Sequence, residues 1–455
     1  MRSSTKAITA AVLLSALTTL GASGCAGRGG DGASATPELA GRLIAVGIPG
    51  AGGVSQVGTF HPGGPIYDKP TFRAFTRPGG ILDPERLFVV SSSNFGAPLG
   101  RPDQPQGSVL SLDPRGAAPI TIPASFAAAG GQVSALEGRV MLYTANSPAF
   151  MNRVYNPGAV TADLVPVANP TAISINNAFG RPWFTNVPSG LSGTGTQSVI
   201  DPDGRPLDGA PSKIAGGIFA GALTNRVPQL IPGAMATGAL ATALLGKSPD
   251  GGGRAVFAGL HADGSVIQIH VELGVDGLAP AGTITRLDSG SRAARSGMVF
   301  NWVPNRILYV ADPAANAIVA LTLVPDGKVF RVESTRRLVA PALDMPVDLA
   351  PAVVEVANPG FASNTTLAGE ADIYVLNRGN GTVVRLKQSG AVVAVRSVAL
   401  PGIGRLGPGR LSGIAGAADA RRMWITISGS LPGQPEGALI EVPAFGAPQQ
   451  AAARW

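Results

Sequence analysis

The chain has 455 residues, of which 45% are hydrophobic and 14% charged, and its formal net charge is +7 at pH 7. Charged residues are scarcer than the ~25% of an average soluble protein. Gly (62) and Pro (39) are frequent, which suits many tight turns between short strands. Only six of the 35 basic residues are Lys, and the Arg residues are scattered rather than interleaved with aromatic residues, which excludes a nucleic-acid partner.

The N-terminus has the order of a secretory signal: a basic start, an apolar run at 7–20 and small residues before Cys25. A cysteine directly after such small residues resembles the signal of bacterial lipoproteins, in which Cys25 carries the lipid. Ala22 stands where that family commonly has Leu. Two alternatives stay open, an ordinary signal peptide cleaved nearby and an uncleaved anchor.

The lipoprotein resemblance implies that residues 1–24 are removed and that lipid on Cys25 attaches the protein to a bacterial membrane. The protein would then face the periplasm or the cell surface. Ala26 in place of Asp favours the outer membrane. Because Cys25 is the only cysteine, the mature chain is expected to have no disulfide and to depend on packing for its stability.

Residues 25–37 are rich in Gly, Ala and Ser, which is typical of a flexible tether. After them, one pattern recurs seven times: an Arg or Asp and then three to five apolar or β-branched residues. The occurrences are 86–90, 139–144, 181–185, 254–258, 306–310, 372–376 and 422–426. Such short apolar runs between turn residues predict buried strands.

A second strand follows in most units, at 107–112, 196–200, 264–270, 317–323, 381–386 and 437–442. Units of roughly 40–50 residues with about four strands each are the signature of a β-propeller. We therefore predict an all-β fold at 38–446, a single propeller of about seven four-stranded blades, with six or eight as alternatives. The strand at 42–48 would complete the last blade, and 447–455 would form a tail. Two β-sandwich domains are the competing architecture.

Two spacings between units are long and predict insertions, near 209–245 and at 353–370. The weakest unit is 131–166, because its second strand is short.

Several units carry enough detail to name relatives. The runs from Tyr309 through Asp312 to Asn316, and from Tyr374 through Asn377 to Asn380, resemble the NHL-type repeat. The run 183–186 with 198–201 is similar to the YVTN-type repeat of bacterial surface propellers, and 345–350 and 169–173 resemble innermost blade strands. This resemblance implies a propeller that is either a binding platform or an enzyme such as a lactonase, lyase or dehydrogenase. It specifies fold more than activity.

Groups for acid–base chemistry are few. The three histidines, His61, His261 and His270, lie apart in the predicted strands and turns and form no zinc motif. No Cys-x-x-Cys-His run is present, which excludes covalently attached haem. The Gly-rich runs do not join a strand to a helix, as a phosphate-binding loop requires.

The remaining site candidates are polar residues that end the predicted strand 86–90 and its equivalents: Asn94, Asn146, Asn186, Asp312 and Asn377. The loops after these strands converge on one face around a central channel. There, several Asn and Asp oxygens are a ligand set for Ca²⁺, as in the metal-dependent lactonases that the resemblance implies. The alternative is that each side chain bonds its own turn. Further acidic residues near these loops are Asp68, Asp83, Glu137 and Asp348.

Two functions from different classes follow. The first is a non-catalytic binding or assembly platform in the cell envelope, monomeric, with a protein or polymer as its ligand, favoured because titratable groups are scarce. The second is a metal-dependent lactonase or hydrolase that uses the Asn and Asp candidates. A quinone-dependent dehydrogenase is disfavoured by the small number of histidines.

Overall fold

The computed structural model describes only part of the chain. The described residues are 36–57, 86–91, 108–123, 126, 136, 139–145, 170–176, 181–186, 217–220, 229–230, 241–247, 249–250, 254–260, 265–274, 277–279, 284–288, 296–301, 306–352, 365–366, 372–416 and 421–446. By its contacts the chain divides into Met1–Ala35 and Thr36–Trp455, and every described residue belongs to the second unit. The predicted signal, Cys25 and the tail at 447–455 lie outside the described residues, so those boundaries stay predictions.

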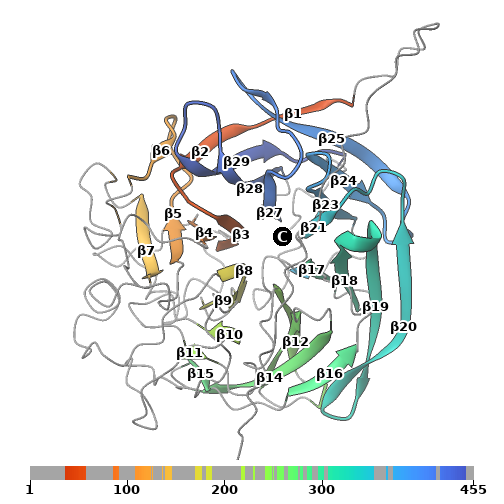
Figure 1. Cartoon of the computed structure of the whole chain (residues 1–455). Helices are drawn as coiled ribbons and strands as arrows, with labels where there is room; N and C mark the ends of the chain where they lie inside the picture. Colours follow the sequence, from red (N-terminus) through yellow and green to blue (C-terminus); the bar gives the residue numbers. More distant parts are fainter. Residues whose placement is uncertain are drawn as a thin grey trace, which may run out of the picture. The chain divides into compact units, whose positions relative to one another are not determined.

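The described residues of this unit form six sheets (Figure 1), and no helix among them is long and apolar enough to cross a bilayer. The first three sheets come from the N-terminal half of the chain. The first contains β3 (Ala51–Val57), β4 (Arg86–Ser91), β5 (Ser108–Leu112) and β7 (Val140–Ala145). The second contains β8 (Pro170–Asn176), β9 (Arg181–Asn186), β10 (Gly217–Ala220) and β11 (Gln229–Leu230). The third contains β12 (Ala241–Lys247), β13 (Arg254–Leu260), β14 (Val266–Gly274), β15 (Gly277–Ala279) and β16 (Ile284–Asp288).

The other three sheets each include a short strand from a distant segment. The fourth contains β17 (Ser296–Asn301), β18 (Ile307–Asp312), β19 (Ala317–Asp326), β20 (Val329–Val339) and β22 (Thr365–Thr366). The fifth contains β21 (Pro346–Pro351), β23 (Ile373–Asn377), β24 (Thr382–Leu386), β25 (Val392–Leu400), β26 (Gly404–Arg405) and β1 (Glu38–Ala40). The sixth contains β27 (Leu411–Gly416), β28 (Arg422–Ser430), β29 (Glu436–Pro443), β2 (Arg42–Val46) and β6 (Ile120–Thr121).

Each sheet begins with an inner strand, and the inner strands contact one another in chain order around the centre of Figure 1. They are β3, β8, β12, β17, β21 and β27, and β27 also contacts β3. In every sheet the next strand runs antiparallel to the inner one. This is the arrangement of a β-propeller, as the sequence predicts.

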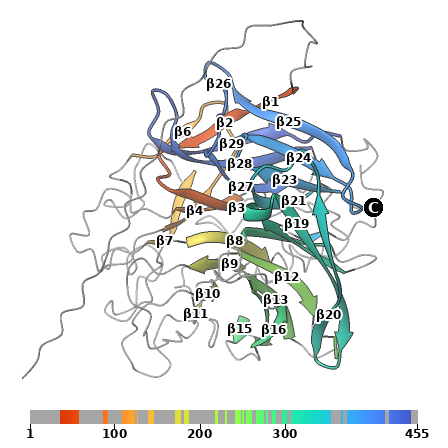
Figure 2. The same ribbon diagram turned by 45° about the vertical axis from the view of Figure 1, so that its right-hand side comes forward.

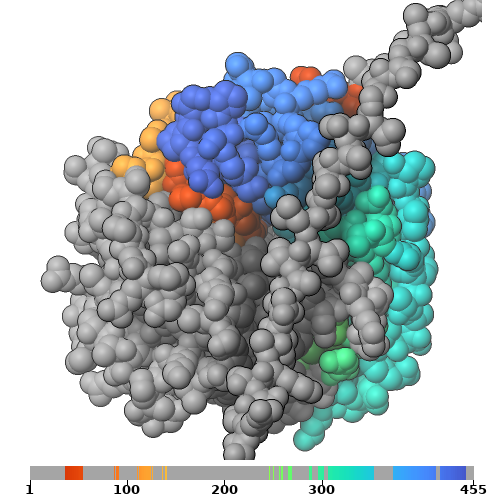
Figure 3. Space-filling model, viewed as in Figure 1, coloured from red at the N-terminus to blue at the C-terminus, as the bar shows by residue number. Residues whose placement is uncertain are grey.

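The N-terminal strands join sheets that are built mainly from the C-terminal part of the chain. β2 pairs antiparallel with β29, in the place predicted for the strand at 42–48, and β1 pairs parallel with β25. In Figures 2 and 3 these red segments lie against the blue segments of the last two sheets. The pairing covers edges that would otherwise be open to another chain.

One sequence prediction about the units is wrong, and another falls on residues that the structure does not describe. The run at 139–144 does not begin a blade of its own, because β7 is the fourth strand of the first sheet and pairs with β5. The described part of the chain therefore forms six sheets from the seven predicted units. The third strand of the second sheet is β10, whereas the predicted partner at 196–200 lies outside the described residues.

The predicted insertions also contribute strands to the sheets. The segment 209–245 contains β10, β11 and the start of β12. The segment 353–370 contains β22, which pairs parallel with β17.

The core lies between successive sheets. β18 is buried along its whole length: Ile307, Tyr309 and Ala311 pack toward the fifth sheet, while Leu308 and Val310 pack toward the third. A strand that is covered on both faces has a continuous apolar run rather than an alternating one. The fifth and sixth sheets share a cluster that includes Tyr374, Met423 and Ile425.

Gly437 lies where the backbone that follows β2 approaches β29 closely, so substituting it tests this contact. Its carbonyl accepts hydrogen bonds from the backbone N–H groups of Gly47 and Ile48, at 2.9 and 3.2 Å. Its φ is 75°, and a Cβ there would collide with the carbonyl of Ile48. Gly433 has a similar φ of 69° with nothing within 4 Å of a Cβ.

We predict that Gly433→Ala costs about 1–2 kcal/mol of unfolding free energy from backbone strain alone, and that Gly437→Ala costs clearly more. Urea unfolding measures both. Equal losses would show that the close approach of β2 to β29 does not constrain the fold.

Candidate functional site

The inner strands share a bulge, which places equivalent residues around the centre. In four of them the register with the neighbouring strand skips the second residue of the inner strand, whereas β12 skips Leu245 further along. The skipped residues are Thr171, Gly297, Val347 and Ser412, and the residues that follow them are Ala172, Met298, Asp348 and Gly413. Bulges re-aim side chains and are frequent next to functional sites. Among the described residues of the six inner strands, Asp348 is the only carboxylate.

The Asp348 carboxylate joins two inner strands. Its Oδ2 accepts a hydrogen bond from the backbone N–H of Ile414 in β27 at 2.9 Å, and its Oδ1 accepts one from Leu349 at 2.9 Å. On the other side, Gly297 of β17 has a φ of 53°, and a Cβ there would lie 2.6 Å from Oδ1. A glycine is therefore required for β17 to approach this carboxylate.

The environment of Asp348 changes its acidity. The side chain is half-buried. Burial raises the pKa of Asp348 to about 7, while the hydrogen bonds from Ile414 and Leu349 act in the opposite direction because they stabilise the carboxylate. A carboxyl group with this pKa is present in both protonation states at neutral pH, which is what general acid–base catalysis requires.

Asp312 is one of the predicted site residues, and its contacts lie in its own blade. It ends β18 and is buried. Its Oδ1 accepts a hydrogen bond from Ala315 N at 3.1 Å, which caps the short 3-10 turn η3 (Pro313–Ala315), and its Oδ2 lies 3.6 Å from Arg337. One carboxylate oxygen thus caps the β18–β19 turn, and the other faces Arg337 of β20 (Val329–Val339) in the same sheet.

Asn377 occupies the same place at the end of β23 and is fully buried. Its Oδ1 accepts a hydrogen bond from Asp344 N at 3.2 Å, and its Nδ2 donates to Ala342 O at 2.7 Å and to Thr382 Oγ1 at 3.0 Å. These bonds hold the segment that crosses from β20 to β21. They engage the oxygen that a cation would need, so the structure gives Asn377 a structural contact, and its role as a ligand stays a prediction.

The other predicted site residues are less informative. Asn186 ends β9 and pairs with Pro170 and Gly217 along the backbone. Asn94 and Asn146 lie outside the described residues, and so do His61 and His261. His270 lies within β14, opposite Val256. Within the described ranges, no three His, Cys, Asp or Glu side chains are grouped closely enough to hold a metal ion.

Among the known proteins compared with this chain, only solved structures show similarity to it. No family model and no curated protein matches the chain. It is similar to a calcium-binding protein, regucalcin, from Agrobacterium tumefaciens (15% identity, 62% of this chain and 92% of that one, TM-score 0.32). It is also similar to a gluconolactonase from Xanthomonas campestris (12%, 90% and 95%, 0.37) and to virginiamycin B lyase from Staphylococcus aureus (9%, 89% and 99%, 0.34). Similarities this distant carry no argument about activity.

Substituting Asn377 tests whether the polar residues at the strand ends stabilise the fold or bind a metal ion. We predict that Asn377→Ala lowers the free energy of unfolding by about 2–4 kcal/mol, because two buried backbone groups and Thr382 lose their partner. The loss should be the same with and without added Ca²⁺ or Zn²⁺. If the wild type is stabilised by either ion and the variant is not, Asn377 is a ligand.

The raised pKa of Asp348 predicts that the free energy of unfolding depends on pH. Its folded-state pKa of about 7 lies above its ordinary value of 3.8, so the folded state binds the proton more tightly than the unfolded state does. Stability should therefore fall as the pH rises from about 4 to about 7, by at most about 4 kcal/mol, and by less because the side chain keeps some contact with water. Thermal unfolding across this range should show a smaller slope for Asp348→Asn. The exposed Asp326→Asn is the control, and equal slopes in both variants would contradict the assignment.

Proposed function

We propose that this chain is an exported propeller, anchored in a bacterial envelope through lipid on Cys25, that acts as a non-catalytic binding platform. The observation that supports it most is the use of Asp312 and Asn377. Asp312 caps the turn that follows it, and Asn377 bonds Thr382 and the segment that crosses from β20 to β21, so both residues stiffen the frame. A rigid ring that presents loops is the usual way for a scaffold to position a binding surface.

A second candidate, a hydrolase or lactonase, is favoured by Asp348 alone. This residue departs from the symmetry of the inner strands, where equivalent positions hold Ala172, Met298 and Gly413. A structural need recurs in every blade, whereas a catalytic group is required once. In this candidate function Asp348 would accept the proton of a water that attacks an ester or lactone carbonyl.

Measuring the turnover of lactones and esters distinguishes the binding platform from the hydrolase. The full-length protein would be purified in detergent, its metal content measured by elemental analysis, and a panel of lactones and esters offered with and without Ca²⁺ and Zn²⁺. The platform predicts no turnover above the uncatalysed rate for the wild type and for Asp348→Asn.

Turnover that is lost in Asp348→Asn and kept in Asp326→Asn would replace the platform by the hydrolase. One tightly held divalent ion per chain, together with turnover, would favour the metal-dependent form of that hydrolase.

A further inference from the structure

A cavity of about 450 Å³ opens on the outer three strands of the fourth sheet, β18, β19 and β20 (Figure 1). The described residues that line it are Arg306, Ile307, Thr322, Leu323, Val324, Glu333 and Arg336. The lining residues of β18 and β19 are mostly apolar and are buried or half-buried, whereas the two residues of β20 are exposed. A cavity of this size suits a small ligand rather than a folded protein.

The cavity lies at an irregular point of the sheet. The register between β19 and β20 shifts between Thr322 and Leu323, and Glu333 is the residue of β20 that it skips. Arg306, which directly precedes β18, has a φ of 46°. Bulges re-aim side chains and are frequent next to functional sites, and left-handed backbone at a residue other than glycine is also concentrated there. Two such irregularities thus meet at one cavity.

Glu333 supplies the cavity with a carboxylate that is not neutralised. The side chain is exposed and, in the part of the chain that the structure describes, has no hydrogen-bond or ion-pair partner. No ion pair joins it to Arg336, although both residues line the same cavity. A cationic group of a ligand can therefore reach this carboxylate.

Arg336 supplies a cation that the protein holds in place. Its Nη2 donates to Gln388 O at 2.8 Å, in the hairpin between β24 and β25 of the fifth sheet. This carbonyl positions the guanidinium without cancelling its charge and uses one of its five N–H donors. Arg306 has another contact within the protein, so we assign it no role in holding a ligand.

The hydroxyl group in the same row as Arg336 does not cancel the charge either. Tyr309 pairs with Ala320, which pairs with Arg336. The Tyr309 hydroxyl is buried and has no hydrogen-bond partner. Burial raises the pKa of Tyr309 to about 12, while the charge of Arg336 acts in the opposite direction. The hydroxyl is therefore uncharged at neutral pH, and Arg336 keeps its charge for a ligand.

The spacing of the two charges indicates the length of the ligand. Glu333 and Arg336 are three residues apart on one strand, so their backbones are separated by at most about 10 Å. A free amino acid carries both charges on one carbon atom. In an extended peptide of two or three residues, the ammonium and the carboxylate are about 7–10 Å apart. Ile307, Leu323 and Val324 offer apolar contacts to its side chains.

We propose that this cavity binds a short apolar peptide of two or three residues through both of its free termini. Glu333 holds the ammonium, and the Arg336 guanidinium, whose fork matches the paired oxygens of a carboxylate, holds the other end. This inference goes beyond the proposed platform function, because the cavity lies away from the inner strands and can bind a peptide whether or not the protein turns over a lactone.

Binding would be measured by isothermal titration calorimetry on the full-length protein in lipid nanodiscs, since free detergent could enter an apolar cavity. The probe is the tripeptide Leu-Ala-Leu with both termini free. The comparison ligands are its N-acetylated form, its C-terminal amide and free leucine. We expect the free tripeptide to bind and each comparison ligand to bind about tenfold more weakly, because it loses one charge-assisted hydrogen bond or the length to make both.

Two variants test which side chain holds which terminus. Glu333→Gln should weaken the binding of the free tripeptide about tenfold and leave the affinity for the N-acetylated form unchanged, because that form has no ammonium. Arg336→Gln should have the same effect on the free tripeptide and leave the affinity for the amide unchanged. The matched controls, Asp326→Asn and Arg331→Gln, neutralise exposed groups of β19 and β20 outside the cavity and should keep the wild-type affinity.

Four outcomes would overturn the inference: no binding of the free tripeptide, equally tight binding of free leucine, equal losses for the free and the matching capped peptide in a cavity variant, or equal losses in the controls. A merely structural effect of Arg336→Gln, which also loses the bond to Gln388, would weaken every ligand alike. None of these outcomes depends on turnover, so failure of the peptide site is distinguishable from failure of the platform.

Discussion

The pairing of β2 with β29 holds the start of the folded unit in its last sheet, and much of the remaining structure depends on it. Residues 38–57 supply one strand to each of three successive sheets: β1 to the fifth, β2 to the sixth and β3 to the first. Without this segment, β25 and β29 would each expose an edge, and the first sheet would lack its inner strand. Gly437 lets the backbones approach, so one residue without a side chain permits the joint.

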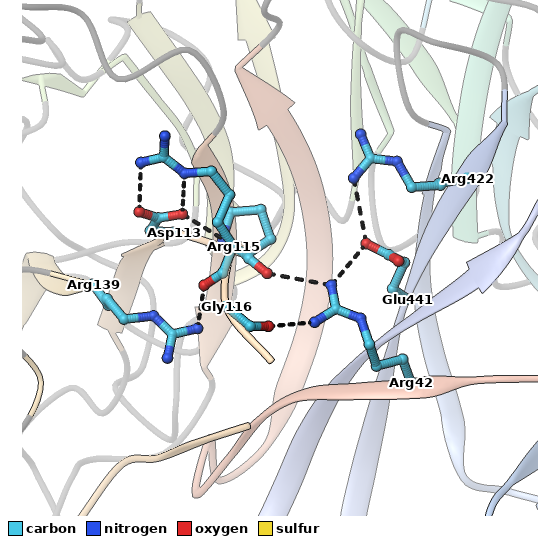
Figure 4. A network of polar contacts seen from close by, with 8 residues as sticks. Arg42, Asp113, Arg115, Gly116, Arg139, Arg422 and Glu441 are labelled. Carbon is cyan, nitrogen blue, oxygen red and sulfur yellow. Dashed lines mark hydrogen bonds and ion pairs between the residues drawn. The ribbon is translucent and has the colours of Figure 1, made fainter. Parts of the chain in front are cut away.

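A network of charged side chains and backbone carbonyls lies at this same joint (Figure 4). Arg42 belongs to β2, Glu441 and Arg422 belong to β29 and β28, and the carbonyls that Arg42 contacts follow β5 of the first sheet. Charged side chains from both ends of the chain therefore meet only when β2 is paired. Folding and the formation of these contacts are coupled, because the pairing that covers the edge of the sixth sheet also brings Arg42 to Glu441.

The sequence patterns predict where strands occur better than they predict the position of each strand, from inner to outer, within its blade. An Arg followed by an apolar run marks a strand that starts on one face, as for β4, β13, β18 and β28. The same pattern precedes β7, which is an outer strand, because β7 starts on the same side two steps further out. Local patterns predict direction and burial, whereas pairing partners are chosen by tertiary contacts. This is why 139–144 was taken for a separate blade.

The site residues were predicted unevenly for a similar reason. Asp312 is recognisable in the sequence because it caps the turn next to it. Asn377 ends the equivalent strand, but its backbone partners Asp344 and Ala342 lie 33 and 35 positions away. Asp348 was noticed only as a spare acidic residue, since the N–H of Ile414 that it accepts lies 66 positions away. The ion pair of Arg42 with Glu441 joins the two ends of the folded unit, and nothing local to either position predicts the contact. What sequence reasoning missed are the interactions that exist only between blades.

Arginine is used in two ways in this fold. Arg385 is 5% exposed, lies 2.6 Å from Asp372 and donates to Phe445 O at 3.0 Å; its charge is cancelled inside the protein. A buried ion of this kind requires its partner, since removing one charge strands the other. Arg42 is more exposed, donates to Gly116 O at 2.7 Å and also lies 3.2 Å from Glu441. Arg139 donates to the carbonyls of Arg115 and Ala118 and makes no ion pair among the described residues. Arg42 and Arg139 thus hold the segment that follows β5, whereas Arg385 holds the residues that follow β29.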